Sequence, residues 1–417
     1  MSTQQQKQKI SFTEALKRSG LVNLSDLTQI EAELKELTGD STVQERDLAD
    51  ALERNRLITS WQRELLEDGY WEGFFLDKYR LLKPLGSGGM CCVYLAKHEL
   101  LQRKVAIKVL KPKGIEKESN LKRFQRESQA LATLDHENVV KVFDGGQQNG
   151  FHYTVMEYVA GSDLRNLTID RGPLPIKAVV QLMAQAADGL ACLHENQVIH
   201  RDIKPANLLV DGQGKLRIAD LGLALPVDLA NDSPTMENNS LLGTVDYLAP
   251  EQARDSHYVT PKVDIYSLGC TFYYLLTGEA PFARGSLTDR LLKHQVDKPA
   301  RLDHKRSDVP RELAWLCNQM LRKNPELRPT AEEVAELMRH WLQLHDEKVQ
   351  RQKEAVQAAK RQSSAQPCTT GHGSTVWNKG DTLSLNKPER ATKRDLPAIS
   401  QEETQMKTND FHVMNAN

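Results

Sequence analysis

VIHRDIKPANLLV, residues 198–210, carries the strongest signal in this amino-acid sequence. Asp202, Lys204 and Asn207 fall within one short polar loop of this stretch, ahead of an apolar run. Transfer of a phosphoryl group to a hydroxyl needs a carboxylate near the nucleophile, a cation near the γ-phosphate and an oxygen ligand for Mg²⁺. The loop supplies these residue types at a suitable spacing, which favours a phosphotransfer site over a surface turn.

The neighbouring segments add further groups of the kind that such a site needs. KLRIADLGLA, residues 215–224, predicts a strand that ends at Asp220, a second oxygen ligand for Mg²⁺. In KVAIKVL, residues 104–110, side chains alternate between faces, so Ala106 and Lys108 share one face of a strand. Glu127 lies on the inward face of the next predicted helix. We expect it to pair with Lys108; the alternative is a solvated carboxylate on the helix flank.

A glycine-rich segment, LGSGGMCCVYLA, occupies residues 85–96. It matches the phosphate-covering pattern G-x-G-x-x-G-x-V at Gly86, Gly88 and Val93, but Cys91 stands where the third glycine would be. Such matches are common by chance, so the segment alone is a weak signal. The first two glycines would permit close approach of the backbone to a phosphate.

In combination, these motifs resemble those of bacterial eukaryotic-type (Hanks-type) serine/threonine protein kinases. The shared features are the glycine loop, VAIK at 105–108, Glu127, HRDIKPAN at 200–207, DLG at 220–222, APE at 249–251, Asp264 and Arg328. They occur in the order of that family and extend over residues 79–345. The resemblance implies an α+β fold of two lobes, a small β-rich N-lobe with one key helix and a larger, mainly α-helical C-lobe, with ATP between them.

The resemblance also implies a role for each matching residue. Asp202 would be the catalytic base, Lys204 would steady the γ-phosphate, and Asn207 and Asp220 would hold Mg²⁺. The implied ATP-binding residues are Leu85, Gly86, Ser87, Gly88, Gly89, Met90, Cys91, Cys92, Val93, Ala106, Lys108, Glu127, Glu157, Val159, Asp163 and Leu209.

Other residues receive structural roles from the same resemblance. Asp264 is expected to bind the backbone of the catalytic loop, and Glu251 and Arg328 are expected to form a buried ion pair. His200 is expected to pack rather than to exchange protons. Met156 would lie at the back of the adenine pocket as the gatekeeper.

The segment from Asp220 to Glu251 corresponds to the activation segment of that family. In such kinases an arginine at the place of Arg201 often pairs with a phosphate on this segment. Ser240 and Thr235 are therefore candidate autophosphorylation sites, and the spacing to Thr244 favours Ser240. The loop that contains Lys204 resembles that of serine/threonine kinases rather than that of tyrosine kinases.

Composition narrows the class of protein and of partner. A length of 417 residues predicts two or three units, and a formal net charge of −1 offers no argument for nucleic acid binding. Six cysteines without a C-x-x-C spacing are typical of a reduced protein, so we expect a cytoplasmic location. The N-terminus lacks the apolar region of a signal peptide. The apolar stretch 263–278 is expected to be a buried helix, and no transmembrane segment is expected.

We divide the chain into a helical N-terminal segment (1–75), a protein kinase domain (79–345), a helical extension (346–361) and a disordered polar tail (362–417). In the first segment, Ser11 with Glu14 and Thr42 with Glu45 have the spacing of helix capping boxes. The N-terminal helices and the tail are candidate sites for a regulatory partner.

Alternative functions compete with that of a protein kinase. A pseudokinase scaffold would need a broken catalytic set, whereas the lysine, the glutamate, the aspartates and the asparagine are all present. A small-molecule kinase of related fold would generally lack the long segment that ends in APE. Cys91 could act as a redox switch beside ATP, but a free cysteine is more often a small apolar residue. The expected function is therefore Mg-ATP-dependent phosphorylation of serine and threonine in protein substrates, in intracellular signalling.

Overall fold

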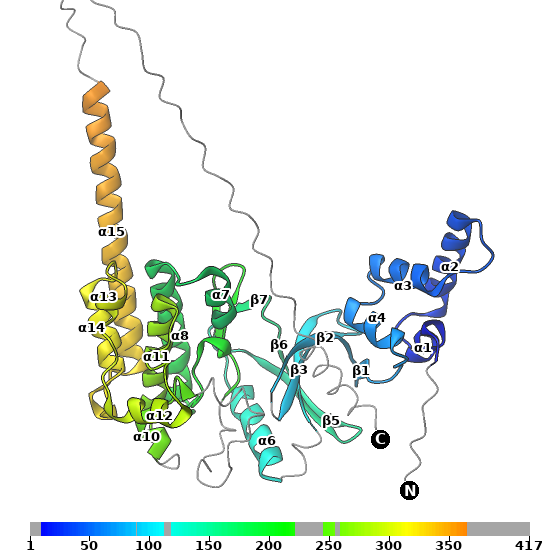
Figure 1. The fold of residues 1–417 in the computed structure, drawn as a ribbon, viewed down its shortest axis with the longest axis horizontal. Coiled ribbons are helices and arrows are strands. Elements are labelled where there is room, and N and C mark those ends of the chain that lie inside the picture. The colour runs from blue at the N-terminus through cyan, green and yellow to red at the C-terminus, as the bar shows by residue number, and fades with distance from the viewer. Residues whose placement is uncertain (1–9, 89, 112–117, 222–244, 255–258, 365–417) are drawn as a thin grey trace, which may run out of the picture.

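The structure is a computed structural model, and it describes residues 10–88, 90–111, 118–221, 245–254 and 259–364. Figure 1 shows three parts in chain order: a helical leader, a β-rich lobe and a helical lobe from which one long helix projects. We call residues 10–74 the leader.

The leader consists of helices around an apolar core of its own. Its helices are α1 (Phe12–Ser19), α2 (Leu24–Thr38), α3 (Glu45–Arg54) and α4 (Ser60–Glu67). Leu16, Leu52 and Leu66, from three of these helices, are almost completely buried in one cluster. Ser11 caps α1 as expected, because its side chain accepts a hydrogen bond from the Glu14 backbone.

The capping box expected at Thr42 and Glu45 was wrong. The N-cap residue of α3 is Gln44, which makes no side-chain cap bond. Glu45 instead accepts a hydrogen bond from the backbone of Thr13, at 3.0 Å, and thereby joins α3 to α1. A capping box does occur in the leader, but at Thr59 and Gln62, where α4 begins.

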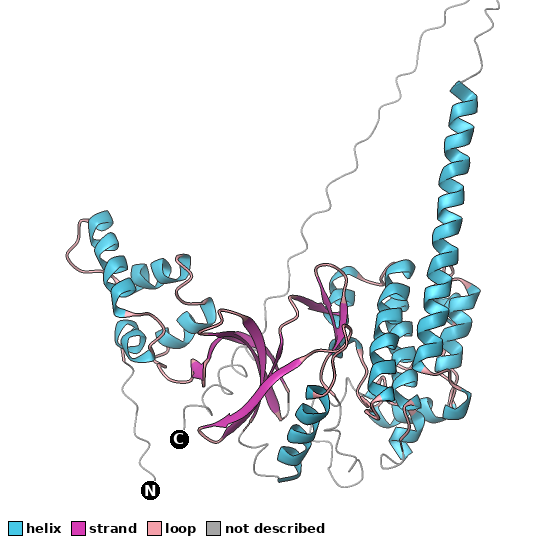
Figure 2. Cartoon of the chain, turned by 180° about the vertical axis from the view of Figure 1, so that it is seen from behind, coloured by secondary structure: helices cyan, strands magenta, loops and turns pink. Residues whose placement is uncertain are grey.

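The N-lobe is a six-stranded antiparallel sheet with one helix beside it. The strand order is β1-β2-β3-β4-β6-β5, and Figure 2 shows α6 next to this sheet. The elements are β1 (Phe75–Leu76), β2 (Tyr79–Ser87), β3 (Cys91–His98), β4 (Lys104–Leu110), α6 (Glu118–Ala132), β5 (Val142–Gln148) and β6 (Phe151–Glu157). Alternation along β4 places Ile107 in the outer core and Ala106 toward the other lobe.

The C-lobe is mainly helical, with a small sheet next to the N-lobe. Its sheet has the order β7-β8-β9. The elements are β7 (Gly161–Asp163), α7 (Leu164–Arg171), α8 (Ile176–Glu195), η1 (Pro205–Asn207), β8 (Leu208–Asp211), β9 (Leu216–Ile218), α10 (Pro250–Arg254), α11 (Lys262–Thr277), α12 (Leu287–Val296), α13 (Leu302–Lys305), α14 (Arg311–Met320), η3 (Pro325–Leu327) and α15 (Ala331–Ser364). The apolar stretch 263–278 forms α11, whose residues are nearly all buried, as expected for a core helix.

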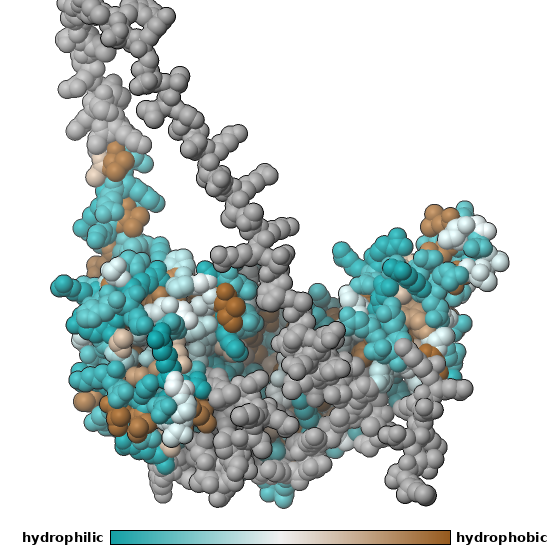
Figure 3. Space-filling view, viewed as in Figure 1, coloured by the Kyte–Doolittle hydropathy of each residue, from teal (hydrophilic) through white to brown (hydrophobic). Residues whose placement is uncertain are grey.

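Two long helices of the C-lobe lie against each other. α15 packs along α8, and ion pairs join Lys177 to Asp346 and Asp188 to Arg339. Within the described residues, α8 is long and apolar enough to cross a membrane, but 61% of that window is buried in the protein, as in an ordinary core helix. Beyond Asp346, α15 projects away from the lobe, and Figure 3 shows a mostly hydrophilic surface there with a few separate apolar spots. Val356 is an exposed apolar residue in this part of the helix.

Candidate active site

A cleft of about 410 Å³ lies between the two lobes. Strands β2, β3 and β4 and the segment after β6 line one side of it, and β7, β8 and the end of β9 line the other. The residues of this lining include Leu85, Gly86, Val93, Ala106, Met156, Glu157, Val159, Asp163, Leu209 and Asp220. Sequence reasoning therefore selected residues from segments far apart in the chain that the fold brings to one cavity.

The inner part of the cleft is apolar. Ala106, Met156 and Ala219 are buried in one small cluster, against which Val93 and Leu209 pack from opposite lobes. Flat apolar surfaces on two sides suit an aromatic ring, and the backbone of residues 157–159 runs along the edge of the cavity. The placement of Val93, Ala106 and Leu209 agrees with the adenine pocket that the family resemblance implies.

Lys108 lies beside Asp220, which lines the cleft. Its Nζ atom is 2.6 Å from Glu127 Oε1 and 3.2 Å from Asp220 Oδ1. Burial opposes the charge on Lys108, but the carboxylates of Asp220 and Glu127 outweigh it and raise the pKa of the lysine. Burial raises the pKa of Glu127, whereas the charge of Lys108 holds the pKa of Asp220 below its ordinary value. The expected pairing of Lys108 with Glu127 is thus present, and Asp220 extends it.

The catalytic loop forms a second polar group. Lys204 Nζ donates to Asp202 Oδ2 at 2.8 Å, and Asn207 Nδ2 donates to the same oxygen at 3.0 Å. A further bond from Asn207 to the Asp202 carbonyl, at 2.8 Å, closes the loop. The short helix η1 begins at Pro205, whose fixed φ suits that position. Among the described residues, Asp202 Oδ1 remains free to accept a hydrogen bond from a ligand.

Buried groups beneath the loop hold it in place. Asp264 is fully buried and accepts hydrogen bonds from the backbone amides of His200 and Arg201, at 2.9 and 2.7 Å. The ring of His200 is also fully buried, and it bonds to the Ala219 carbonyl and to the Asp202 amide. Arg201 adopts a positive φ of 68°, which a loop without these contacts would not favour. Asp264 and His200 therefore have the structural roles expected of them.

The glycine-rich segment is described in part. Gly89 lies outside the described residues, and of the described glycines in this segment Gly86 lines the cleft, whereas Gly88 does not. Ser87 accepts a hydrogen bond from Lys111 Nζ at 2.9 Å, and the Gly88 amide donates to the Cys91 carbonyl. The side chain of Cys92 is buried in the core on the other face of β3, so Cys92 can reach the cleft only through its backbone. Met90 likewise is not among the lining residues.

Sequence reasoning missed two residues, one at the hinge between the lobes and one in the cleft. Arg217 of β9 pairs with Glu157 at 2.9 Å and with Asp211 at 3.1 Å, so it joins the end of β6 to the C-lobe sheet. Val140 completes the apolar part of the cleft. Neither residue belongs to a recognisable motif, so no local signal could have identified it.

Comparison with known proteins agrees with this geometry. The family model of the protein kinase domain matches residues 79–341. The chain belongs to the protein kinase family. The matched region covers both lobes and every described residue of the cleft.

Two similar curated proteins are bacterial kinases. Serine/threonine-protein kinase PrkC of Bacillus subtilis is 38% identical over 258 residues, which are 62% of this chain and 39% of that protein. Serine/threonine-protein kinase PknB of Mycobacterium leprae is 36% identical over 269 residues, which are 63% of this chain and 43% of that protein. The chain thus matches about two fifths of the length of these relatives, in the kinase domain. The bacterial Hanks-type resemblance read from the motifs is confirmed.

Proposed function

We propose that this protein is a Mg·ATP-dependent protein kinase that transfers the γ-phosphate to serine or threonine hydroxyls of proteins. The observation that carries the proposal is the proximity of two polar groups to each other, next to the end of the cleft that Asp220 lines. Lys108, Glu127 and Asp220 form the first group, and Asp202, Lys204 and Asn207 form the second. Relatives whose printed names are serine/threonine-protein kinases support the choice of acceptor.

Each group has a task that its geometry suits. Asp202 would accept the proton of the substrate hydroxyl through Oδ1, since Lys204 and Asn207 already bind Oδ2. Lys204 would then lie beside the transferred phosphoryl group. Lys108, held by Glu127, would contact the phosphates further inside. Fixed charges of this kind contribute most of the catalysis in phosphoryl transfer.

The chain offers oxygen ligands that fit Mg²⁺. The Asn207 amide nitrogen donates to Asp202, which leaves the amide oxygen of Asn207 as the atom that can bind a cation. Asp220 presents a carboxylate whose pKa is lowered by Lys108 and which therefore stays ionised. Mg²⁺ favours such oxygens together with phosphate oxygens, and it would neutralise charge on the phosphates.

The pseudokinase alternative has no support. Such proteins lack part of the catalytic set, whereas this chain has each member, in hydrogen-bonding contact with others. The match to the protein kinase domain and the relative named as a kinase both support a catalytic function.

We further propose autophosphorylation of the activation segment. The Nε atom of Arg201 is buried without a hydrogen-bond partner in the described part of the chain, so a phosphate would satisfy it. The candidate acceptors Ser240 and Thr235 lie outside the described residues, as does Thr244. A cytoplasmic location, a role in signal transduction, and a regulatory partner at the leader or the C-terminal tail are parts of the same proposal. The five cysteines within the described residues are free thiols, which supports a cytoplasmic location.

The test is transfer of labelled γ-phosphate from Mg·ATP to the chain itself and to a generic basic protein. Replacing the catalytic base, Asp202→Asn, should lower the rate about 10²- to 10⁴-fold and leave Mg·ATP affinity little changed. Asp188→Asn, which removes a carboxylate on α8 paired with Arg339, is the matched control and should retain the rate. Acid-stable phosphoserine or phosphothreonine should appear in wild type only.

Mapping of the phosphorylated residues tests the activation segment. Ser240→Ala should reduce autophosphorylation more than Thr235→Ala. If a variant with both Ser240→Ala and Thr235→Ala kept full kinase activity without phosphate on the activation segment, the proposed autophosphorylation would be contradicted. Binding of Mg·ATP by wild type without any transfer would contradict the kinase proposal and favour a scaffold.

A further inference from the structure

The leader touches the strand that carries the glycine-rich loop. Figure 1 shows α4 beside β2. Strand β2 enters the cleft at Leu85 and Gly86. On its outer side β2 pairs with β1 at Tyr79 and Arg80 alone in the described sheet, and the Leu81 amide bonds to Phe74. Next to these residues, at Leu81 and Leu82, the start of α4 contacts the strand.

Strand β2 is irregular at this place. Its pairing with β3 shifts between Leu81 and Lys83, so Leu82 has no partner residue in β3. A second shift lies between Pro84 and Gly86. Such bulges bend a strand and redirect its side chains, and they leave backbone groups outside the ladder. The course of β2 into Leu85 and Gly86 therefore depends on what holds the first bulge.

The capping box of α4 supplies the missing donors. Thr59 Oγ1 accepts from the Gln62 amide, as a cap does, and donates to the Leu82 carbonyl at 2.6 Å. Gln62 Oε1 accepts from the Thr59 amide, and its Nε2 donates to the Leu81 carbonyl at 2.7 Å. Both side chains of the box thus begin the helix and bind two successive carbonyls of β2 at the bulge.

Two further contacts make this junction rigid. Arg80 of β2 donates to the carbonyls of Leu21 and Leu57, which follow α1 and α3. Trp61 packs against the leader core and against the outer core of the N-lobe sheet, with its ring 6.0 Å from that of Tyr94. The side chain of Gln62 is fully buried at this junction. Because a buried amide without its partners is unfavourable, this arrangement has little freedom to shift.

We propose that Thr59 and Gln62 are positioning residues for the glycine-rich loop. They hold β2 at its first bulge and so set the position of Leu85 and Gly86 over the nucleotide. The leader is then a part of the ATP site, although it touches no nucleotide. This inference rests on the proposed binding of Mg·ATP in the cleft.

The test needs variants that keep the helix cap and lose the contact with β2. Asp at an N-cap position accepts a hydrogen bond from a helix amide as threonine does, but its carboxylate cannot donate a hydrogen bond to the Leu82 carbonyl. Thr59→Asp therefore separates the two tasks. Gln62→Glu keeps the acceptor for the Thr59 amide and for Arg80 and loses the donor to Leu81. Thr59→Ser keeps both functions of the hydroxyl and serves as the rescue.

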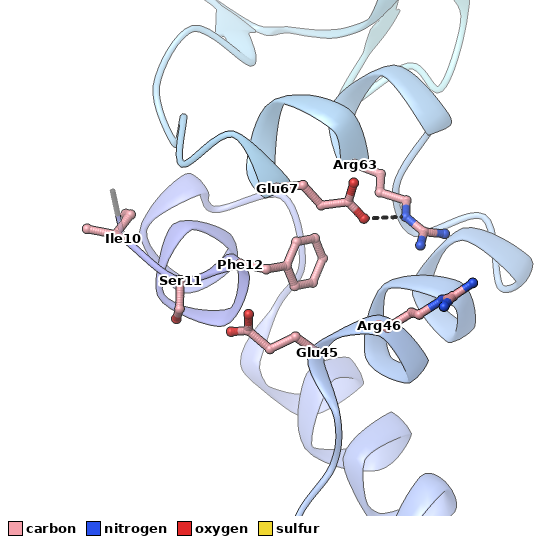
Figure 4. A pocket seen from close by; sticks show the side chains of 7 residues that line it. All are labelled: Ile10, Ser11, Phe12, Glu45, Arg46, Arg63 and Glu67. Atoms are coloured by element: carbon pink, nitrogen blue, oxygen red, sulfur yellow. Dashed lines mark hydrogen bonds and ion pairs between the residues drawn. The ribbon is translucent and has the colours of Figure 1, made fainter. Parts of the chain in front are cut away.

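Arg63 provides a matched control on the same helix. It pairs with Asp50, Glu53 and Glu67, all within the leader. Figure 4 shows Arg63 and Glu67 on the side of α4 that faces Phe12 and Arg46, around a hollow of the leader. Arg63→Gln should therefore weaken the leader without removing a bond to β2.

The measurements are the Kd of Mg·ATP, the KM for ATP and for the protein substrate, kcat, and amide hydrogen exchange in residues 79–93, all on the full chain. In Thr59→Asp and Gln62→Glu we expect Kd and KM for ATP to rise about threefold to tenfold each, as loss of one buried hydrogen bond allows. The KM for the protein substrate should stay constant, and exchange in residues 82–88 should become faster. Thr59→Ser should match wild type, and Arg63→Gln should lower Tm with an unchanged Kd.

Unchanged Kd in both Thr59→Asp and Gln62→Glu, with only a lower Tm, would overturn the inference and leave the junction as a structural contact. An equal rise of Kd in Arg63→Gln would also overturn it, since the effect would then follow leader stability. If Gln62→Glu does not fold, Thr59→Asp decides alone. The Kd of Mg·ATP and the hydrogen-exchange rates need no catalysis, so failure of phosphate transfer alone would overturn the proposed function and not this inference. Absence of Mg·ATP binding by wild type would overturn both.

Discussion

At the residue scale, charge in the cleft is organised around Lys108. Two carboxylates face it, and each responds differently to the same cation. Glu127 is nearly fully buried, so desolvation dominates and raises its pKa, whereas for Asp220 the attraction of Lys108 dominates and lowers the pKa. The lysine stays protonated between them. Asp220 is therefore the carboxylate suited to a cation that arrives from outside.

Cys91 is placed among these groups, and its reactivity can be predicted. Burial raises the pKa of its thiol to about 12, and the positive charge of Lys108 offsets this only in part. Because the thiolate is the nucleophile, on the order of one thiol in 10⁴ would be reactive at pH 7.5. Alkylation of Cys91 by iodoacetamide should therefore be much slower than that of glutathione and should accelerate as pH rises toward 12.

Peptide mass spectrometry of the time course gives this rate for Cys91 itself, and Cys91→Ala identifies the signal. A rate at pH 7.5 equal to that of glutathione would contradict the prediction. It would also restore the redox switch considered for this thiol.

At the scale of elements, one ion pair joins α10, α11 and the turn around η3. Arg328 is fully buried, and its guanidinium contacts both carboxylate oxygens of Glu251, at 2.5 and 2.8 Å. It also donates to the carbonyls of Lys262, Arg322 and Lys323. Every nitrogen of the guanidinium is thus bonded, which is the condition for a buried charge to be tolerated.

Removal of one partner of this pair should destabilise the C-lobe strongly. Arg328→Met leaves Glu251 and three carbonyls without their donor, and we expect a loss of about 3–5 kcal/mol in the free energy of unfolding. The double variant Arg328→Met with Glu251→Met should lose less than the sum of the single changes, because it removes the unpaired charge. Urea unfolding of the four proteins measures this coupling. A loss below about 1 kcal/mol for Arg328→Met would contradict the buried-pair account.

At the scale of the whole molecule, the parts of the chain differ in how they are joined. The leader is anchored to the N-lobe through Gln62, Arg80 and Trp61. The end of α15 has no such contact: from Glu347 on, the described side chains are almost all exposed, and the last ion pair to another element is that of Asp346. One flank is therefore a part of the lobe and the other an extension from it.

Truncation after Lys348 tests this difference. We expect the shortened chain to change its free energy of unfolding by about 0.5 kcal/mol or less, as for other changes at exposed sites, and to keep its Kd for Mg·ATP. Thermal unfolding and nucleotide titration against the full chain give both values. A large loss in either would show that residues 349–417 contact the lobes.

The catalytic loop, the strands that surround the cleft and the family were all predictable from the amino-acid sequence. These features depend on residue type within short segments: alternation defines β4, and the polar loop at 200–207 needs its own side chains for chemistry. The pairing of Lys108 with Glu127 was also predictable, because a carboxylate on an inward face requires a cation.

Three features could be seen only in the folded chain: the contacts of the leader with β2, the bond of Glu45 to Thr13, and the link that Arg217 makes between the hinge and β9. In the first two cases a side chain meets a backbone group, which is the same for every residue type and so leaves no mark in the sequence. In the third, the partners lie far apart in the chain, and any exposed glutamate would have served equally well as a candidate. Contacts of this kind exist only once the folded chain has brought the segments together.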